Sequence, residues 1–313
     1  MGGETGGSKI LHARSGPSLR SRLLILAGAV ALALIALAGI SVWQAYRAAQ
    51  NREEMRILGT AHALARVVDQ EFGRVEALLR GLATSPALDP LDADTVRAQA
   101  RQVTGMLRGG QIALGGRDGQ QVLNTGATLA MLAAGLPLAP GLETVFATGR
   151  AIVTDLFSYP ATGRPSIAVS VPVRRSGNGP PLWVLEAALP PSLLTEALAG
   201  QRLPPGWRAV VLDRSRTIVA RVPEQEAIIG RSPHPALLQQ MEVAPEGIVQ
   251  GMHTQDGVRS VLAFARAPIS GYAVSLAVPE TEFTAARRAA LLRTGAAGLA
   301  IGLLGLGMAG LLA

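Results

Sequence analysis

An uncharged stretch near the N-terminus constrains this chain more than any other feature. Residues 23–42 read LLILAGAVALALIALAGISV and contain no charged side chain over 20 positions. A helix of that length crosses the roughly 30 Å hydrocarbon core of a bilayer. The run is preceded by four basic residues, Lys9, Arg14, Arg20 and Arg22. Basic flanks favour the cytoplasmic side, so we expect a cytoplasmic tail at 1–22 and a membrane helix at 23–43.

A cleaved secretory signal peptide is the alternative interpretation of the same stretch. Apolar cores of signal peptides are about 7–15 residues long, which is shorter than this run. A helical pattern also continues directly from its end, through Trp43 and Tyr46. These two features favour an anchor that stays attached to the chain.

A second apolar run lies at the other end of the sequence. It follows Arg287, Arg288 and Arg293 and is rich in glycine, alanine and leucine. We expect it to form a second membrane helix at 287–313, with small residues that permit close packing in lipid. The sequence stops inside this run, so we expect a cytoplasmic output domain to lie beyond Ala313.

The charge pattern argues against nucleic acid as a partner. The net charge is +7, but the chain has a single lysine, Lys9, and its central arginines are scattered singly. A nucleic-acid surface would gather basic side chains along one face. The clustered positive residues instead lie directly before the first apolar run, where membrane topology explains them.

The residue types needed for catalysis or metal binding do not come together in this sequence. There is no cysteine, which excludes disulfides and thiolate ligands. The histidines are isolated from one another and from paired acids: His12, His62, His234 and His253. We therefore expect no metal, no cofactor and no enzymatic activity within these residues.

A long helix is predicted at 44–84. Apolar residues recur there at alternating steps of three and four, which is typical of a helix that packs along one seam. They are Leu58, Ala61, Ala65, Val68, Phe72, Val75, Leu79 and Leu82. This stripe either packs on the chain's own domain, forms a dimer contact, or does both in different parts.

Beyond Ser85 the pattern changes to short strands and helices, and it occurs twice. In the first unit we expect helices at 93–107, 140–148 and 190–198, and strands at 111–114, 120–124, 151–157, 165–173 and 182–189. In the second unit we expect strands at 207–212, 217–222, 247–253, 258–266 and 272–278, and a helix at 235–241. Asp92 and Gly149 are predicted to cap two of the helices of the first unit.

Three segments carry a resemblance to a known family. They are VFATGRAIVTDLF with RPSIAVSVPV, PPGWRAVVLDRSRTIVAR, and ISGYAVSLAVPETEF. In this order they resemble the double Cache ectodomain of bacterial receptors, and they look most like the ectodomains of sensor histidine kinases. The resemblance implies an α+β fold: a long N-terminal helix with two tandem PAS-like antiparallel-sheet modules, between two membrane helices. The first, membrane-distal module would cover 85–200 and hold the ligand, and the second, membrane-proximal module would cover 201–286.

Within the first module the strand at 165–173 suggests a binding surface. Its branched residues alternate with Ser166, Ala168 and Ser170, so one face suits packing and the other leaves room and hydroxyl groups for a ligand. Glu186, on the neighbouring strand, lies on this face or on its opposite, because the register cannot be read from the sequence. We take Ser166, Ser170 and Glu186 as candidate ligand contacts.

The loop before this strand supplies three further candidates, Asp155, Tyr159 and Arg164. Arg164 could hold a carboxylate and Asp155 an amine of a polar metabolite. Alternatively, Asp155 and Arg164 pair across a hairpin while Tyr159 caps the loop. The amino-acid-binding Cache subgroup carries an Arg-x-Trp-Tyr type signature and a later Asp. This sequence has no such run, and Ala188 stands near the position of that Asp, which puts amino-acid binding in doubt and leaves the ligand class open.

The expected function is the signal-input part of a dimeric receptor in the bacterial inner membrane. Its partners would be a small-molecule ligand, membrane lipid and a second copy of the chain, and its output a histidine kinase in a two-component system. A chemotaxis receptor or a diguanylate cyclase could use the same ectodomain. A bitopic membrane scaffold that binds nothing small is the alternative of a different class.

Overall fold

The computed structural model describes residues 19–175, 179–223, 226–254 and 256–284, together with isolated residues between 288 and 307. The chain divides into two compact units, one of Met1–Arg52 with Thr284–Ala313 and one of Glu53–Phe283. Among the described residues, one helix is long and apolar enough to cross a bilayer. The second membrane helix expected at 287–313 lies outside the continuously described residues.

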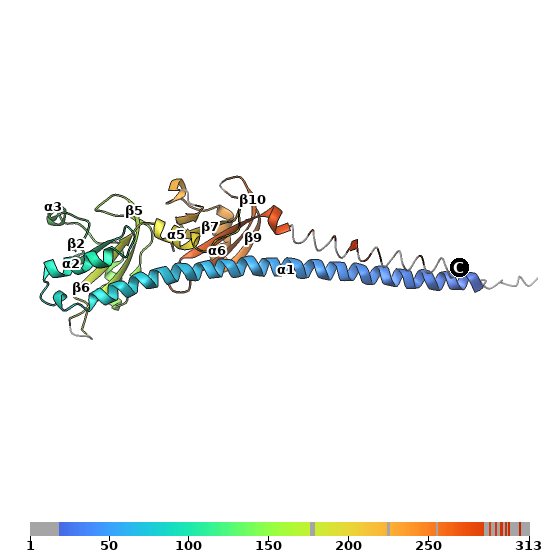
Figure 1. The fold of residues 1–313 in the computed structure, drawn as a ribbon, viewed down its shortest axis with the longest axis horizontal. Helices are drawn as coiled ribbons and strands as arrows, with labels where there is room; N and C mark the ends of the chain where they lie inside the picture. The colour runs from blue at the N-terminus through green and yellow to red at the C-terminus, as the bar shows by residue number, and fades with distance from the viewer. Residues whose placement is uncertain are drawn as a thin grey trace, which may run out of the picture. The chain divides into compact units, whose positions relative to one another are not determined.

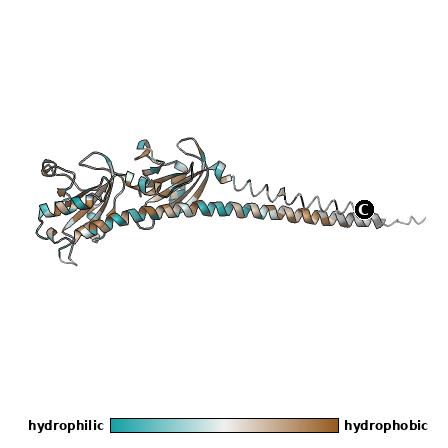
Figure 2. Ribbon diagram, in the orientation of Figure 1, coloured by the Kyte–Doolittle hydropathy of each residue, from teal (hydrophilic) through white to brown (hydrophobic). Residues whose placement is uncertain are grey.

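Helix α1 (Leu19–Ala83) runs for 65 residues without a proline to interrupt it. In its N-terminal part large apolar side chains are exposed; Leu32 is 72% and Ile35 66% exposed. Figure 2 shows this part as almost uniformly hydrophobic, whereas polar and apolar residues alternate further along the helix. A helix that is apolar on all sides over this length could cross a bilayer.

Beyond residue 52 the helix buries one stripe in the core of its own domain. The buried residues are Ile57, Ala61, Leu64, Ala65, Val68, Phe72, Val75, Leu79 and Leu82. The predicted stripe is therefore confirmed as an intramolecular contact, with Ile57 in the place expected for Leu58. These side chains are not available to a second copy of the chain.

The first module is built on an antiparallel sheet with the order β2-β1-β6-β5-β3, in which β4 also pairs with β5. Its strands are β1 (Gln111–Gly115), β2 (Gln121–Asn124), β3 (Ile152–Val153), β4 (Phe157–Ser158), β5 (Pro165–Val173) and β6 (Trp183–Leu189). Its helices are η1 (Pro86–Leu88), α2 (Ala93–Thr104), α3 (Leu129–Ala133), α4 (Leu142–Thr148) and α5 (Ser192–Ala199). Asp92 caps α2, and Gly149 ends α4 in the left-handed conformation, as predicted.

The second module has a five-stranded antiparallel sheet with the order β8-β7-β11-β10-β9. Its strands are β7 (Arg208–Leu212), β8 (Ile218–Val222), β9 (Glu246–His253), β10 (Arg259–Arg266) and β11 (Ala273–Pro279). The helices η2 (Glu226–Ile228) and α6 (Pro235–Val243) complete it. The predicted fold class, a long helix with two antiparallel sheets, is thus confirmed (Figure 1).

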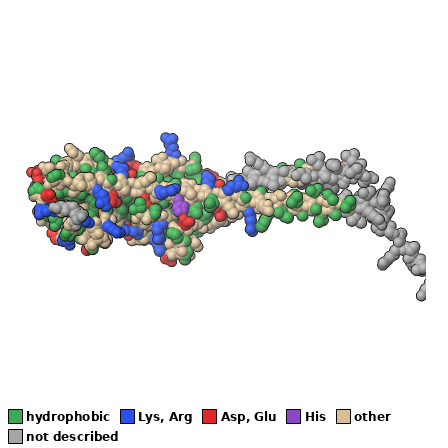
Figure 3. Space-filling model, turned by 90° about the horizontal axis from the view of Figure 1, so that it is seen from below, with side chains coloured by type: hydrophobic (Ala, Val, Ile, Leu, Met, Phe, Trp, Pro, Cys, Tyr) green, Lys and Arg blue, Asp and Glu red, His purple; other side chains and the backbone are tan. Residues whose placement is uncertain are grey.

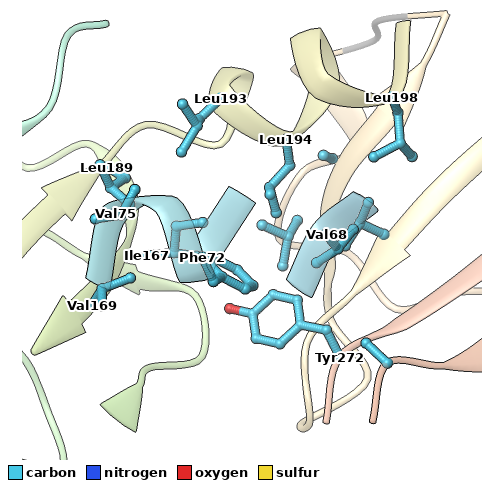
Figure 4. Close-up of a cluster of buried hydrophobic side chains, with 14 of the residues drawn as sticks. Val68, Phe72, Val75, Ile167, Val169, Leu189, Leu193, Leu194, Leu198 and Tyr272 are labelled. Atoms are coloured by element: carbon cyan, nitrogen blue, oxygen red, sulfur yellow. The ribbon is translucent and has the colours of Figure 1, made fainter. Parts of the chain in front are cut away.

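One hydrophobic core joins both sheets to α1 and α5. Val68, Phe72 and Val75 of α1 contact Ile167 and Val169 of the first sheet and Leu194 of α5 in the same cluster as Tyr272 of the second module (Figure 4). The rings of Phe72 and Tyr272 meet edge to face, with their centroids 5.0 Å apart. Burial of this continuous apolar surface holds the two modules together as one unit.

Several elements differ from the sequence prediction. The strand expected at 151–157 is broken into β3 and β4. Between them the Thr154 hydroxyl replaces a backbone acceptor toward β5, and Asp155 turns away to Arg214 and Ser215. The Thr154 hydroxyl accepts a hydrogen bond from the Ala168 N–H at 2.9 Å. Helix α3 was not predicted, and α2 ends at Thr104 rather than at 107.

Candidate functional site

The two faces of strand β5 are used differently, as its alternating residues predict. Ile167, Val169, Val171 and Val173 lie in the core that contains α1. Ser166, Ala168 and Ser170 point to the opposite face of the sheet, where α1 does not pack. This opposite face is the floor of the candidate site.

The strand register brings a row of polar side chains together on this floor. Ser170 lies opposite Glu186, Glu186 opposite Ala113, and Ala113 opposite Asn124, across four neighbouring strands. The structure therefore answers the question that the sequence left open, since Glu186 shares the face of Ser170. Both side chains are buried, with exposed fractions of 2% for Ser170 and 1% for Glu186.

Glu186 is a carboxyl group in an unusual environment. Its Oε2 accepts a hydrogen bond from the Ala139 N–H at 2.8 Å, and its buried Oε1 has no hydrogen-bond partner among the described residues. Burial raises the pKa of Glu186 from 4.5 to about 7, and the Ala139 N–H opposes this rise only in part. The protonated and the ionised form of this carboxyl are therefore both populated near neutral pH.

Tyr159 is held beside this row by a hydrogen-bond network. The side-chain amide of Asn124 donates to the Tyr159 hydroxyl at 2.8 Å and to Gln121 Oε1 at 2.7 Å. Burial, followed by the nearby Glu186 carboxylate, raises the pKa of Tyr159 to about 12, so the phenol remains protonated at physiological pH. The sequence analysis missed Asn124 and Gln121; their polar character on an inward-facing strand is the signal that could have identified them.

A cleft of about 630 Å³ opens along this face of the first module. Three of the predicted site residues, Tyr159, Arg164 and Ser166, line it together with Ala188. Gln111, which was not predicted, also lines the cleft, and its buried Oε1 has no hydrogen-bond partner among the described residues. The volume lies within the range of about 300–1,000 Å³ that small-molecule sites occupy.

The charged groups of the cleft come from two modules. Arg164 lines the cleft from the first module, and Asp155, its expected partner, is paired with Arg214 instead. Glu226, from η2 of the second module, lines the same cleft. A guanidinium group and a carboxylate therefore line a space that is large enough for a metabolite. A ligand there could bind a positive and a negative side chain at the same time.

The remaining predicted residues lie outside the cleft lining. Ser170 and Glu186 lie on the same sheet face but deeper, covered by the segment that contains Ala139. Asp155 lines a different, smaller cavity of about 360 Å³ beside Arg214. The structure thus brings Tyr159, Arg164 and Ser166 together and separates Asp155 from them.

Asp155 links the two modules instead of facing Arg164. Its Oδ1 accepts from the Arg214 N–H and from Arg214 Nε at 3.2 and 2.9 Å, and its Oδ2 accepts from the Ser215 hydroxyl at 2.7 Å. Burial raises the pKa of Asp155, but the hydrogen bonds from Arg214 and Ser215 outweigh it and hold the pKa below its ordinary value.

Neighbours of Asp155 extend this link. The Tyr272 hydroxyl donates to the Thr154 carbonyl at 2.7 Å, and the Leu156 N–H donates to Asp213 Oδ2 at 3.1 Å. Three residues further along the chain, Tyr159 forms part of the cleft wall. A single loop therefore contacts both the cleft and the second module.

Comparison with known proteins identifies the class of fold. No family model matches the chain, and no curated protein matches its sequence. Among solved structures, the fold is similar to the extracellular domain of rpHK1S-Z16, described as a histidine kinase, with a TM-score of 0.57 and 16% identity over 74% of this chain and 96% of that one.

Two chemoreceptor domains are similar to the same extent. The ligand-binding domain of Pseudomonas fluorescens CtaA, in complex with L-isoleucine, has a TM-score of 0.57 at 16% identity, over 76% of this chain and 96% of that one. The ligand-binding domain of Pseudomonas aeruginosa PctB, in complex with L-Gln, has a TM-score of 0.54 at 18% identity, over 74% and 93%. The fold is that of double-Cache-like extracellular ligand-binding domains, which confirms the predicted resemblance.

Proposed function

We propose that this chain is the signal-input region of a receptor in the bacterial inner membrane, and that the cleft of the first module binds a small polar metabolite. The observation that carries the proposal is the cleft itself, where Arg164, Tyr159 and Gln111 converge on the sheet face opposite the core. The fold, shared with extracellular domains of a histidine kinase and of chemoreceptors, supports a sensory role.

Each residue of the site has a distinct role in this proposal. Arg164 holds an anionic group of the ligand, and the hydroxyl groups of Tyr159 and Ser166 bind polar substituents. Glu226, which also lines the cleft, binds a cationic group of the ligand, the role that the sequence predicted for Asp155. Because the similar domains of CtaA and PctB were solved with amino acids, amino acids are the first ligands to screen.

The buried residues serve the cleft indirectly. Ser170 and Glu186 form the layer behind the wall, and Asn124 in the same row fixes the position of Tyr159. Asp155 carries the signal, since a loop that closes over the ligand at Tyr159 also pulls on Arg214 and Ser215. Asp69 of α1 accepts hydrogen bonds from the Ile269 and Ser270 N–H groups of the second module, both at 2.9 Å. Through these bonds a displacement of the second module would reach α1.

The membrane topology and the output are part of the same proposal. The chain crosses the bilayer at 23–43 and at 287–313, so that both modules lie outside the cytoplasm. The output is a histidine kinase of a two-component system; a chemotaxis receptor or a diguanylate cyclase would use the same input. A reporter fused at residue 177 should behave as periplasmic, and a cytosolic reporter would contradict the topology.

A dimer would use the outer face of α1, because the inner stripe is buried in the domain. Gly59, Ala63, Gly73 and Ala77 are exposed there, and nothing lies within 4 Å of a Cβ placed on either glycine. Small residues let two helices approach closely. Cysteines at Ala63 or Ala77 should form symmetric cross-links in membranes, whereas a cysteine at the buried Ala65 should not.

Ligand binding is tested by thermal-shift screening of the chain in detergent against amino acids and other polar metabolites. A ligand of the cleft should raise the melting temperature of the wild type, and Arg164→Ala should weaken its binding about 10- to 100-fold, as expected for a lost charged hydrogen bond. Arg101→Ala, at an exposed position of α2, is the matched control. No response across a broad library would favour the scaffold alternative.

A further inference from the structure

The second module contains a cavity of its own, of about 490 Å³. It lies between α6 and the sheet face that does not pack on α1. Strand β7 shows this division, because Ala209 and Val211 belong to the core shared with α1 while Val210 lines the cavity. The hydrocarbon part of the lining includes Ile218, Leu237, Met252, Leu262 and Ala277.

One end of this apolar cavity carries two guanidinium groups. Val210 lies opposite Arg221 on the neighbouring strand, so Arg208, two residues before Val210, shares the face of Arg221. The side chain of Arg221 is only 6% exposed and that of Arg208 is 22% exposed. Arginine is almost never buried without a carboxylate or a comparable anion to bind.

A carboxylate from a turn already contacts both groups. Asp256, between β9 and β10, lies 2.7 Å from Arg208 Nε through its Oδ2, and Arg221 Nη2 donates to the same oxygen. Asp256 remains 29% exposed, so it approaches from the solvent side. The carboxylate on the guanidinium groups thus comes from the connection between β9 and β10 and not from a strand of the sheet.

The chemistry of the lining selects the ligand. Among the described residues that line the cavity, the charged or titratable ones are Arg208, Arg221, His234 and His253, and none of them is acidic. His234 accepts a hydrogen bond from the Ala236 N–H through Nδ1, as the cap of α6. The hydroxyl groups of Thr254 and Ser275 also line the space. Anion-binding donors thus lie beside branched and thioether side chains.

We infer that the second module binds a small amphiphilic carboxylate, with its carboxylate on Arg208 and Arg221 and its hydrocarbon chain against Leu237, Met252 and Leu262. The planar guanidinium fork matches a carboxylate in a bidentate manner. The ligand competes with Asp256 for the shared donors, and its binding displaces the Asp256 carboxylate from them. This site is separate from the cleft of the first module and does not depend on a ligand there.

The inference is tested by isothermal titration of hexanoate into the full chain in nanodiscs, with empty nanodiscs as the blank. Hexanoate should bind, whereas 1-hexanol and hexylamine, which share its hydrocarbon chain, should bind at least about 10-fold more weakly. Equal binding of hexanoate and 1-hexanol would overturn the inference, because the arginines would then have no part in it. Absence of hexanoate binding would overturn it as well.

Two substitutions with opposite expected effects separate recognition from folding. Arg208→Gln should weaken hexanoate binding about 10-fold, while Asp256→Asn should strengthen it several-fold by removing the competing carboxylate. Arg259→Gln, next to the site on β10 but paired with Glu280, is the matched control and should bind as the wild type does. If Asp256→Asn weakens binding, or if Arg164→Ala in the first module abolishes it, the second module is not the site.

Discussion

The substitution Glu186→Gln removes an ionisable group from a position that is 1% exposed while changing its shape very little. Glutamine keeps a carbonyl oxygen that can accept the hydrogen bond of the Ala139 N–H. It also fills the same space between β5 and β1. What changes is the ability to ionise, so the effect on stability should depend on pH.

The sign follows from the raised pKa of Glu186. Below pH 4.5 the carboxyl is protonated in the folded and the unfolded chain, and ionisation has no effect on stability. Between 4.5 and about 7 the folded state binds more protons than the unfolded state, so the free energy of unfolding falls as the pH rises. Above pH 7 the full destabilisation is present, and it amounts to about 3 kcal/mol at 1.36 kcal/mol per pKa unit.

Urea denaturation of Glu53–Phe283 at several pH values between 5 and 8 measures this effect. Glu186→Gln should be more stable than the wild type by up to about 3 kcal/mol at pH 8, and the difference should shrink toward zero at pH 5. Glu143→Gln, at an exposed position on α4, is the matched control and should show no such trend. A difference that does not change with pH, or a variant less stable than the wild type at pH 8, would refute the reasoning.

Three further predictions concern the packing of α1 and the link between the modules. Phe72→Ala should lower the free energy of unfolding by about 3–5 kcal/mol, because it empties a buried site against Tyr272; urea denaturation measures the loss. Asp69→Ala should lower the free energy of unfolding by about 2–4 kcal/mol, because two backbone N–H groups lose their acceptor. The control Gln70→Ala, at the exposed neighbouring position, should change it by less than about 0.5 kcal/mol. Asp155→Ala should lower the free energy of unfolding by about 1–2 kcal/mol at neutral pH. Because the folded-state pKa of Asp155 is lowered, this difference should begin to shrink as the pH falls through the ordinary value of 3.8 and should vanish only below the lowered pKa; a difference that persists there would contradict the ionic link.

Charged side chains of both signs lie on the surface of the unit Glu53–Phe283. Acidic and basic side chains are interspersed over the face shown in Figure 3. Several of them are paired at i,i+3 or i,i+4 along α1, such as Glu71 with Arg74 and Glu76 with Arg80. Exposed pairs of this kind contribute at most about 1 kcal/mol each, so they bear on solubility more than on the fold.

Local rules in the sequence determined the elements of this protein. The stripe on α1, the alternation along β5 and the glycine that ends α4 all depend on periods and backbone preferences within one segment. For this reason the long helix, nearly all strands and the repeated module could be predicted without knowledge of what packs where. The apolar run at 23–42 was equally readable, because its length and composition are those of a helix that could cross a bilayer.

Tertiary structure alone decided which polar groups meet. Glu186 shares a face with Ser170 because of strand register, and Asp155 bonds to Arg214, some sixty positions away, because a shared core brings the two modules together. Likewise, Arg221 and Asp256 meet only once β8 and the β9–β10 turn are in place. Side-chain identity limits what each group can bind, but long-range packing sets its distance to every partner, and no local pattern encodes that distance.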